Sequence, residues 1–415
     1  MTFQLSDKQR ELQMRIREFA QREIAPVAAK YDEEETFPRE LFRKMGEEGI
    51  LALMLPEAQG GKEMSCVDFC IAGEEISAAC GAVSLSMGAH AVLCAHNLAR
   101  NGTPEQKAKY LPKLGSGEWI GALAMTEPQS GSDVLSLATR AEKRGGSWIL
   151  NGTKTYITNA AVADVILLYA RTSEELGPHG ISAFLVETRT PGFRIDHTFK
   201  KMGMRASPTS QFSMTNVEIP EENLLGVENG GLAILMSGLD VERATGGSLG
   251  VGIARGAYEL ALHHARRRRQ FKKPVIKYQM IGSMLADMYM QIEAARLLTF
   301  NAAAKCDSGQ RATLEASMAK LYAAEIAEKV TMDAIQIHGG HGYMRMAGVE
   351  KYARDAKLLT IGGGTSQIQK MIIIKHLTGE WGTVDVATEP RLFMPSEGPA
   401  DPWIQEVDEP AHSAN

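Results

Sequence analysis

A short segment of small and hydroxyl-bearing residues is the first candidate for chemistry. Residues 124–133 read Ala-Met-Thr-Glu-Pro-Gln-Ser-Gly-Ser-Asp. Small residues such as Gly131 and Ser132 let backbone amides approach an anionic group closely. Taken alone, Gly-Ser-Asp is also typical of a common turn. These residue types therefore permit anion binding without requiring it.

Glu242 is the second candidate, in the stretch Leu239-Asp240-Val241-Glu242-Arg243. A carboxylate within hydrogen-bond reach of a substrate can remove a proton, best when an apolar site raises its pKa toward neutrality. Without further context, a glutamate on a helix is more often an exposed residue that pairs with a neighbouring arginine. The residue type by itself does not assign a base.

The first part of the chain, residues 1–120, is expected to form helices. Ser6-Asp7-Lys8-Gln9 fits a capping box. Leu12, Ile16 and Phe19 then recur at helical spacing. Pro26 is placed where that helix should end or kink.

Strands are expected between residues 121 and 229. Ser147–Gly152, Val165–Tyr169 and Ile181–Val186 have strand composition, with Gly, Asn and Pro between them. Helices do not alternate with these strands, so the pattern does not predict a Rossmann domain. No Gly-x-Gly-x-x-Gly motif follows a strand to seat a nicotinamide cofactor.

The last third of the chain divides into a helical part and a tail. Residues 230–381 are rich in Ala, Met and Leu and predict helices. Residues 382–415 are proline-rich and mostly acidic, which predicts a surface tail. The order of helices, strands and helices gives an α+β fold class.

Composition excludes several classes of protein. Apolar residues make up 44% and charged residues 23% of the 415 residues, as in soluble globular proteins. We expect no membrane span, because no run of about 18 apolar residues occurs. The net charge of -5 argues against nucleic-acid binding, and the arginine run at 266–269 indicates a solvated helix end.

The five cysteines predict free thiols rather than a metal site. They are Cys66, Cys70, Cys80, Cys94 and Cys306. The count is odd and no pair has zinc-site spacing, so we expect no metal and buried thiols in a reducing compartment. The polar N-terminus does not resemble a secretory signal. A cytoplasmic location is therefore expected.

Two segments of the chain resemble the signatures of one enzyme family. Residues 124–133 resemble the first signature of the acyl-CoA dehydrogenase family, and Gln336–Tyr343, Gln-Ile-His-Gly-Gly-His-Gly-Tyr, resembles the second. The resemblance is closest to the isovaleryl-CoA dehydrogenase type and extends from about Gly88 to about Gln369. It implies a β-domain between two helical domains.

The resemblance also implies a relocated catalytic base. Most members of the family carry a glutamate before the Gly-Thr that matches Gly364-Thr365, but this chain has Gly363 there. Isovaleryl-CoA and long-chain types take the base from a Leu-Asp-x-Glu-Arg stretch, which matches Glu242. The family removes an α-proton and a β-hydride from an acyl-CoA thioester, and FAD accepts the hydride at N5. The backbone N–H at Gly363 is then an expected donor to the thioester oxygen.

The family's cofactor contacts map onto three groups of residues. The resemblance implies that FAD contacts, in the expected β-domain, Leu123, Met125, Thr126, Gly131, Ser132, Tyr156, Ile157 and Thr158. It implies that the FAD of a neighbouring subunit contacts Arg268, Phe271, Gln279, Gln336, Gly339 and Gly340. It implies pyrophosphate contacts from Thr365, Ser366 and Gln367. A homotetramer, arranged as a dimer of dimers, is therefore expected.

Substrate contacts are implied in the same way, for Ser132, Ala233, Asp240, Arg243, Gly363 and Gly364. For Arg243, an ordinary ion pair on the helix surface is an equally good interpretation. Ala233 and residues 244–247, Ala-Thr-Gly-Gly, are smaller than the isovaleryl-type residues. We therefore expect a short- or medium-chain, branched acyl group that is longer or more branched than isovaleryl.

Three functions remain open at this point. The first is an acyl-CoA dehydrogenase that passes electrons to an electron-transfer flavoprotein. The second is an acyl-CoA oxidase or an acyl-carrier-protein dehydrogenase on the same scaffold. The third is a non-catalytic flavin-binding protein, against which the presence of Glu242 argues.

Overall fold

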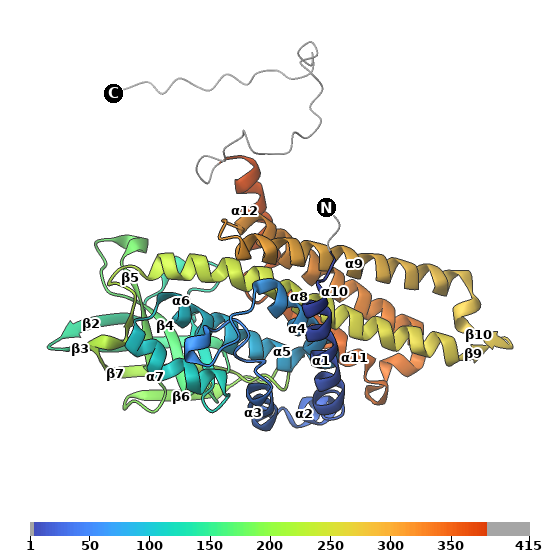
Figure 1. The fold of residues 1–415 in the computed structure, drawn as a ribbon, viewed down its shortest axis with the longest axis horizontal. Helices are drawn as coiled ribbons and strands as arrows, with labels where there is room; N and C mark the ends of the chain where they lie inside the picture. The colour runs from blue at the N-terminus through green and yellow to red at the C-terminus, as the bar shows by residue number, and fades with distance from the viewer. Residues whose placement is uncertain (1–3, 380–415) are drawn as a thin grey trace, which may run out of the picture. The chain divides into compact units, whose positions relative to one another are not determined.

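The computed structural model describes residues 4–379, and the predicted tail at 382–415 lies outside them. Within the described part, helices come first, a sheet follows and helices return (Figure 1). The predicted α+β class is confirmed by this order. The domain boundaries at 120, 229 and 381 stay predictions.

The N-terminal helices begin with the expected capping box. The Ser6 N–H donates to Gln9 Oε1 at 3.0 Å, and the Gln9 N–H donates to Ser6 Oγ at 3.2 Å. Helix α1 (Asp7–Phe19) buries Leu12, Ile16 and Phe19, as their spacing predicts. The following elements are η1 (Ala20–Ile24), α2 (Ala28–Glu34), α3 (Arg39–Glu47), η2 (Glu57–Gln59), α4 (Cys66–Ala79), α5 (Gly81–Gly88), η3 (Ala89–His96), α6 (Asn97–Asn101) and α7 (Pro104–Gly115).

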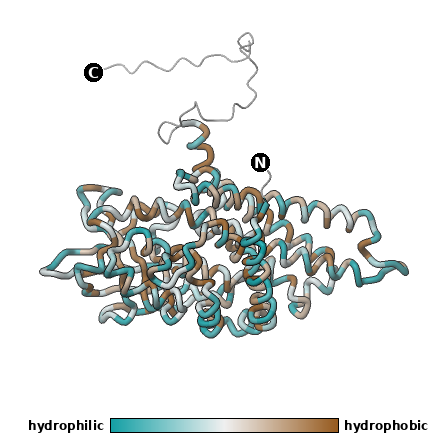
Figure 2. The backbone as a smooth tube through the Cα atoms, in the orientation of Figure 1, coloured by the Kyte–Doolittle hydropathy of each residue, from teal (hydrophilic) through white to brown (hydrophobic). Residues whose placement is uncertain are grey.

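Strands β1 to β8 form one sheet with the order β6-β7-β3-β2-β4-β5-β8, in which β1 pairs with β4 in parallel. They are β1 (Gly121–Ala124), β2 (Arg140–Arg144), β3 (Ser147–Thr158), β4 (Val165–Arg171), β5 (Ile181–Glu187), β6 (Phe193–Thr198), β7 (Thr209–Pro220) and β8 (Leu224–Leu225). The three predicted strand segments coincide with β3, β4 and β5. Figure 2 shows hydrophilic residues at the turn between β2 and β3, at the edge of the described fold.

A bulge in strand β3 alters the direction of one predicted flavin contact. The register between β3 and β7 shifts between Lys154 and Ile157. Tyr156 lies inside this shift with a left-handed φ of 57°. Bulges commonly redirect a side chain beside a functional site. Here Tyr156 is 65% exposed, whereas Ile157 is buried.

The C-terminal helices are long and closely packed. The elements are α8 (Gly231–Arg267), β9 (Arg269–Gln270), β10 (Lys273–Pro274), η7 (Val275–Lys277), α9 (Gln279–Asp307), α10 (Thr313–His338), η8 (Gly339–Tyr343), η9 (Arg345–Ala347), α11 (Val349–Ala356), η10 (Lys357–Thr360) and α12 (Ser366–Leu377). At Gly252 of α8, an added Cβ would lie 1.9 Å from Ser77 Oγ of α4. The close approach of these two helices therefore requires glycine at 252.

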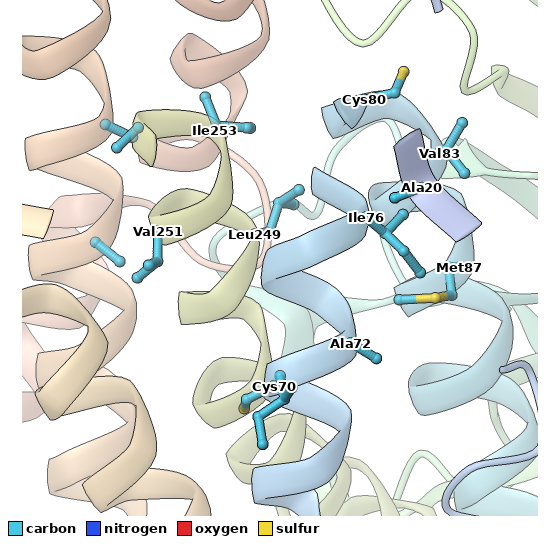
Figure 3. Close-up of a cluster of buried hydrophobic side chains, with 14 of the residues drawn as sticks. Ala20, Cys70, Ala72, Ile76, Cys80, Val83, Met87, Leu249, Val251 and Ile253 are labelled. Atoms are coloured by element: carbon cyan, nitrogen blue, oxygen red, sulfur yellow. The ribbon is translucent and has the colours of Figure 1, made fainter. Parts of the chain in front are cut away.

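Apolar side chains fill the contact between α4, α5 and α8 (Figure 3). Ile76 lies on α4, and Leu249 and Ile253 lie on α8. The expected free thiols join this and the neighbouring clusters, since Cys66, Cys70, Cys80 and Cys94 are buried and free. Cys306 is also free but only partly buried, so the expectation of burial holds for it only in part.

A cluster of charges crosses the same interior. Glu74 of α4 accepts two hydrogen bonds from Arg296 of α9, both at 2.8 Å. Glu75 accepts one from Arg255 of α8 at 2.7 Å. Both glutamates are buried. Because removing one partner of a buried ion pair leaves an uncompensated charge, this cluster ties α4, α8 and α9 together.

None of the helices within residues 4–379 is long and apolar enough to cross a membrane.

Candidate active site

Glu242 lies on the first half of α8 and turns its carboxylate toward the protein interior. Its Oε2 atom is buried and has no hydrogen-bond partner, although the residue as a whole keeps partial exposure. Burial raises the pKa of this carboxyl above its usual value, while the charges of Arg243 and Lys320 oppose the rise. A buried carboxyl with a raised pKa and a free oxygen has the properties of a general base. This is not the exposed, arginine-paired glutamate of the simpler interpretation.

The loop at Gly363 faces that carboxylate. Gly363 has a left-handed φ of 63°, and a Cβ added there would lie 2.6 Å from Glu242 Oε1. The carboxylate of Glu242 thus occupies the space where a side chain at position 363 would begin. The structure therefore brings together the two positions on which the idea of a relocated base depends.

Two side chains that sequence reasoning missed bind the backbone of this loop. Lys320 of α10 donates from Nζ to Leu359 O at 2.7 Å and to Gly364 O at 2.6 Å. Gln369 of α12 donates from Nε2 to Gly363 O at 3.3 Å and to Gly364 O at 3.2 Å. A lysine or glutamine within a helix gives no sequence signal for such a contact, because the partners are distant backbone atoms.

Asp240 and Arg243 form a polar group on either side of Glu242 in the sequence of α8. Thr313 Oγ1 donates to Asp240 Oδ2 at 2.7 Å, and Arg243 Nη1 lies 3.6 Å from Asp240 Oδ1. Arg243 is buried and its Nε has no hydrogen-bond partner. The ion pair expected as the alternative role of Arg243 is present, but it is buried rather than on the surface. The free Nε leaves a donor for a ligand.

The segment at residues 124–133 is held by a buried ion pair that sequence reasoning also missed. Lys154 Nζ lies 2.7 Å from Glu127 Oε1 and donates to Met125 O at 3.0 Å. Both side chains are almost fully buried, at 0% and 2% exposure. Burial alone would raise the pKa of Glu127, but Lys154 and the backbone N–H of Ala138 lower it to about 2. Glu127 is therefore ionised at neutral pH.

The surface beside this pair is open to a ligand. Gly131 and Ser132 are exposed, and a Cβ added at Gly131 would meet no atom within 4 Å. The exposed ring of Tyr156 lies 4.9 Å from the Phe199 ring. An exposed aromatic ring can pack on a flat cofactor, and small exposed residues let backbone amides approach its phosphate group. FAD has both parts, so these residues fit it.

Three of the other predicted cofactor residues, Arg268, Phe271 and Gln279, lie far from Glu242. Arg268 follows the C-terminal end of α8, which places it about 39 Å along the helix axis from Glu242. Phe271 is 88% exposed in the turn between β9 and β10, and Gln279 begins α9 beside it. Figure 1 shows this hairpin at the opposite end of the helices from the sheet. Arg268 therefore cannot contact a group that lies against Glu242 of the same chain.

The second signature also lies near this distant end. Gln336, Gly339 and Gly340 are exposed. The ring of His338 packs 4.4 Å from that of His264 near the C-terminal end of α8. Within the described ranges, no group of three or more His, Cys, Asp or Glu side chains could hold a metal ion.

Of the predicted acyl-pocket residues, some lie close to Glu242 and one lies further away. Ala233 is exposed in the first turn of α8, about 13 Å along the axis from Glu242. The structure does not bring it to the carboxylate. Gly246 lies one turn after Glu242, and a Cβ added there would meet no atom within 4 Å. Of these two positions, only Gly246 has open space close to Glu242 along the helix.

Domain profiles of one family match almost the whole described chain. Those of the N-terminal, middle and C-terminal domains of acyl-CoA dehydrogenase match residues 6–118, 122–217 and 229–378. The chain is 42% identical over 376 residues to a mitochondrial isovaleryl-CoA dehydrogenase of Solanum tuberosum, over 90% of this chain and 91% of that protein.

Solved structures agree with this match. Butyryl-CoA dehydrogenase from Megasphaera elsdenii has a TM-score of 0.89 and 36% identity, over 91% of this chain and 100% of the other. An FAD complex of PigA has a TM-score of 0.87 and 32% identity, over 91% and 99%. The predicted resemblance and the predicted cofactor are both confirmed. The chain belongs to the acyl-CoA dehydrogenase family and is an FAD-dependent oxidoreductase.

Proposed function

We propose that Glu242 is the base that removes the α-proton of a short- or medium-chain, branched acyl-CoA, and that the product is the trans-2-enoyl-CoA. One observation carries this proposal. The Glu242 carboxylate lies in the space of the missing side chain at Gly363, 2.6 Å from where its Cβ would be. The Glu242 carboxylate therefore reaches, from the helix, the same space that a side chain at position 363 would reach from the loop.

The proposed reaction breaks two C–H bonds and forms one C=C bond. The α-proton passes to the carboxylate of Glu242, and the electron pair of that bond becomes part of the new double bond. FAD, when bound, takes the β-hydrogen as hydride. The backbone N–H of Gly363 is proposed to donate to the thioester oxygen while negative charge develops on it.

The raised pKa of Glu242 suits this role. A stronger base removes a weakly acidic proton more readily, provided that the group is ionised at the working pH. Burial raises the pKa, and the charges of Arg243 and Lys320 keep the ionised form accessible. Below its raised pKa, Glu242 is protonated and cannot act as a base. The rate should therefore increase with pH through that value.

The space beside Gly246 supports an acyl group bulkier than isovaleryl. Gly246 lies on the same face of α8 as Glu242, one turn further along. The absence of atoms around an added Cβ there indicates room next to the reacting carbons. Ser132, Asp240, Arg243 and Gly364 are proposed to contact the CoA part, as the family resemblance implies.

We further propose that an electron-transfer flavoprotein accepts the electrons and that the active form is a homotetramer in the cytoplasm. Support for assembly comes from the separation of Glu242 and Arg268, about 39 Å along α8. If Arg268 and Gln336 contact FAD, they must contact the FAD of another subunit. Rapid reoxidation of the reduced enzyme by oxygen would instead favour an acyl-CoA oxidase.

The assembly predicts a mass of four chains for the active enzyme. Light scattering of the FAD-loaded protein at micromolar concentration should give this mass. Arg268→Ala should lower FAD content, because the neighbouring subunit loses a contact, and Arg266→Ala on the exposed end of α8 is the control. An active monomer with full FAD would contradict the assembly.

Glu242→Gln should retain FAD and bind acyl-CoA but lose most of its reductive half-reaction. Removal of a positioned base typically lowers the rate by about 10²–10⁴. The amide is isosteric, so folding should be preserved. Anaerobic bleaching of the flavin by a branched acyl-CoA, followed in a stopped-flow instrument, measures the effect. Glu259→Gln is the matched control, since Glu259 lies on the same helix at 57% exposure. Bleaching of Glu242→Gln at the wild-type rate would exclude Glu242 as the base.

Gly363→Ala should lower the reductive rate more than the stability. The new Cβ would lie 2.6 Å from Glu242 Oε1, so the carboxylate must move. Misplacing a catalytic group by about 1 Å can lower a rate by about 10²-fold. Gly362→Ala is the control, because its Cβ would meet only ordinary contacts with Leu358, the nearest at 3.5 Å. Equal rates for the two variants would show that the loop does not limit the base.

Gly246→Leu should shift the preference toward smaller acyl groups. The side chain fills the space beside Glu242, so bulky branched acyl-CoAs should lose kcat/KM while short ones keep it. Each methylene that the pocket no longer accepts changes the ratio by roughly 10–200-fold. A panel of straight and branched acyl-CoAs, compared between variant and wild type, measures this. An unchanged order of substrates would place the acyl group elsewhere.

A further inference from the structure

Lys320 is a buried cation that the proposed reaction does not yet use. It lies on α10 at 7% exposure. Its ammonium donates to two backbone carbonyls, Leu359 O and Gly364 O, at 2.7 and 2.6 Å. A buried ammonium is costly unless it is well hydrogen-bonded and has a compensating charge nearby.

The backbone that Lys320 binds is the loop facing the base. Gly363 and Gly364 both have left-handed φ values, of 63° and 85°. Lys320 and Gln369 bind the carbonyls of this pair. Because a peptide unit is planar, binding a carbonyl also sets the direction of the N–H in the same unit. The two side chains thus set the peptide planes that follow Gly363.

The charge of Lys320 also acts on Glu242. Lys320 lowers the pKa of that carboxyl against the effect of burial, as does Arg243. The loop at 361–366 contributes no charged side chain. On α4, which packs against α8, Glu74 and Glu75 are bound by arginines further along the helices. Lys320 is therefore the cation that reaches Glu242 from outside its own helix.

We propose that Lys320 is a positioning residue for the dehydrogenation, which sets the backbone at 363–364 against Glu242 and keeps a positive charge behind the carboxylate. This inference rests on the proposed role of Glu242. Because the Lys320 ammonium binds the carbonyls of Leu359 and Gly364, it acts through the loop and through Glu242. It combines in one side chain the control of geometry and of charge at the base.

Lys320→Met separates this role from simple packing. Loss of the charge raises the pKa of Glu242, so the rising limb of the rate of flavin bleaching against pH should move upward by about one unit. Loss of the two hydrogen bonds loosens the loop, so the plateau should fall on the order of tenfold. FAD content and the thermal midpoint are measured on the same samples.

Lys320→Arg divides the two effects. It keeps the charge, so the limb should stay at the wild-type pH, but a planar guanidinium does not reproduce the two contacts of the ammonium and the plateau should fall. Lys201→Met is the matched control, because Lys201 is a largely buried lysine that also donates to a backbone carbonyl, that of Ser207, away from Glu242. Its limb should not move.

The outcomes distinguish this inference from the function on which it rests. If Lys320→Met lowers FAD content or thermal midpoint but leaves the limb in place, the residue is only structural and the inference is overturned. If Lys320→Met folds poorly, Lys320→Gln removes the charge with a smaller change in polarity and is judged by the same limb. Wild-type bleaching by Glu242→Gln would instead overturn the assignment of the base.

Discussion

The buried charges between α4, α8 and α9 are the interaction on which the arrangement of the site depends. Glu74 and Glu75 pair with Arg296 and Arg255, each within 2.8 Å, in the interior of the helices. An unpaired member would leave a charge in an apolar interior, so the three helices keep one relative position. Close contacts such as Gly252 against Ser77 are tolerated only at that position. The direction of α8 is therefore fixed by these contacts, independently of the residues of the site.

The direction of α8 fixes the positions of Glu242 and Arg268. The helix carries Glu242 near its start and ends just before Arg268. A base on a helix is held by the packing of the whole element, whereas a base on a loop depends on local contacts. In this protein the helix supplies the carboxylate that we propose as the base, and the loop at 363 supplies only backbone. The side chains of Lys320 and Gln369 then hold that backbone in place.

Features that depend on local sequence could be predicted, and features that depend on distant contacts could not. The capping box at Ser6 and the strand segments of β3 to β5 followed from residue types and spacing, and the family followed from the resemblance of two segments to its signatures. The pairing of Lys154 with Glu127 and the contacts of Lys320 were missed, because each joins segments separated by a fold that spacing does not reveal. Ala233 stays a prediction, since its small side chain suggested a pocket and the helix places it about 13 Å along its axis from Glu242.

The close approach of Gly363 to Glu242 also restricts how such a site can change during evolution. A base can move between helix and loop by losing one carboxylate first or by gaining the other first. Loss first passes through a protein with no base. Gain first places two carboxylates in one small volume, where repulsion keeps one protonated and leaves the other ionised. Only the second order of substitutions preserves a working carboxylate at every step, so the two arrangements are connected through a crowded intermediate rather than an empty one.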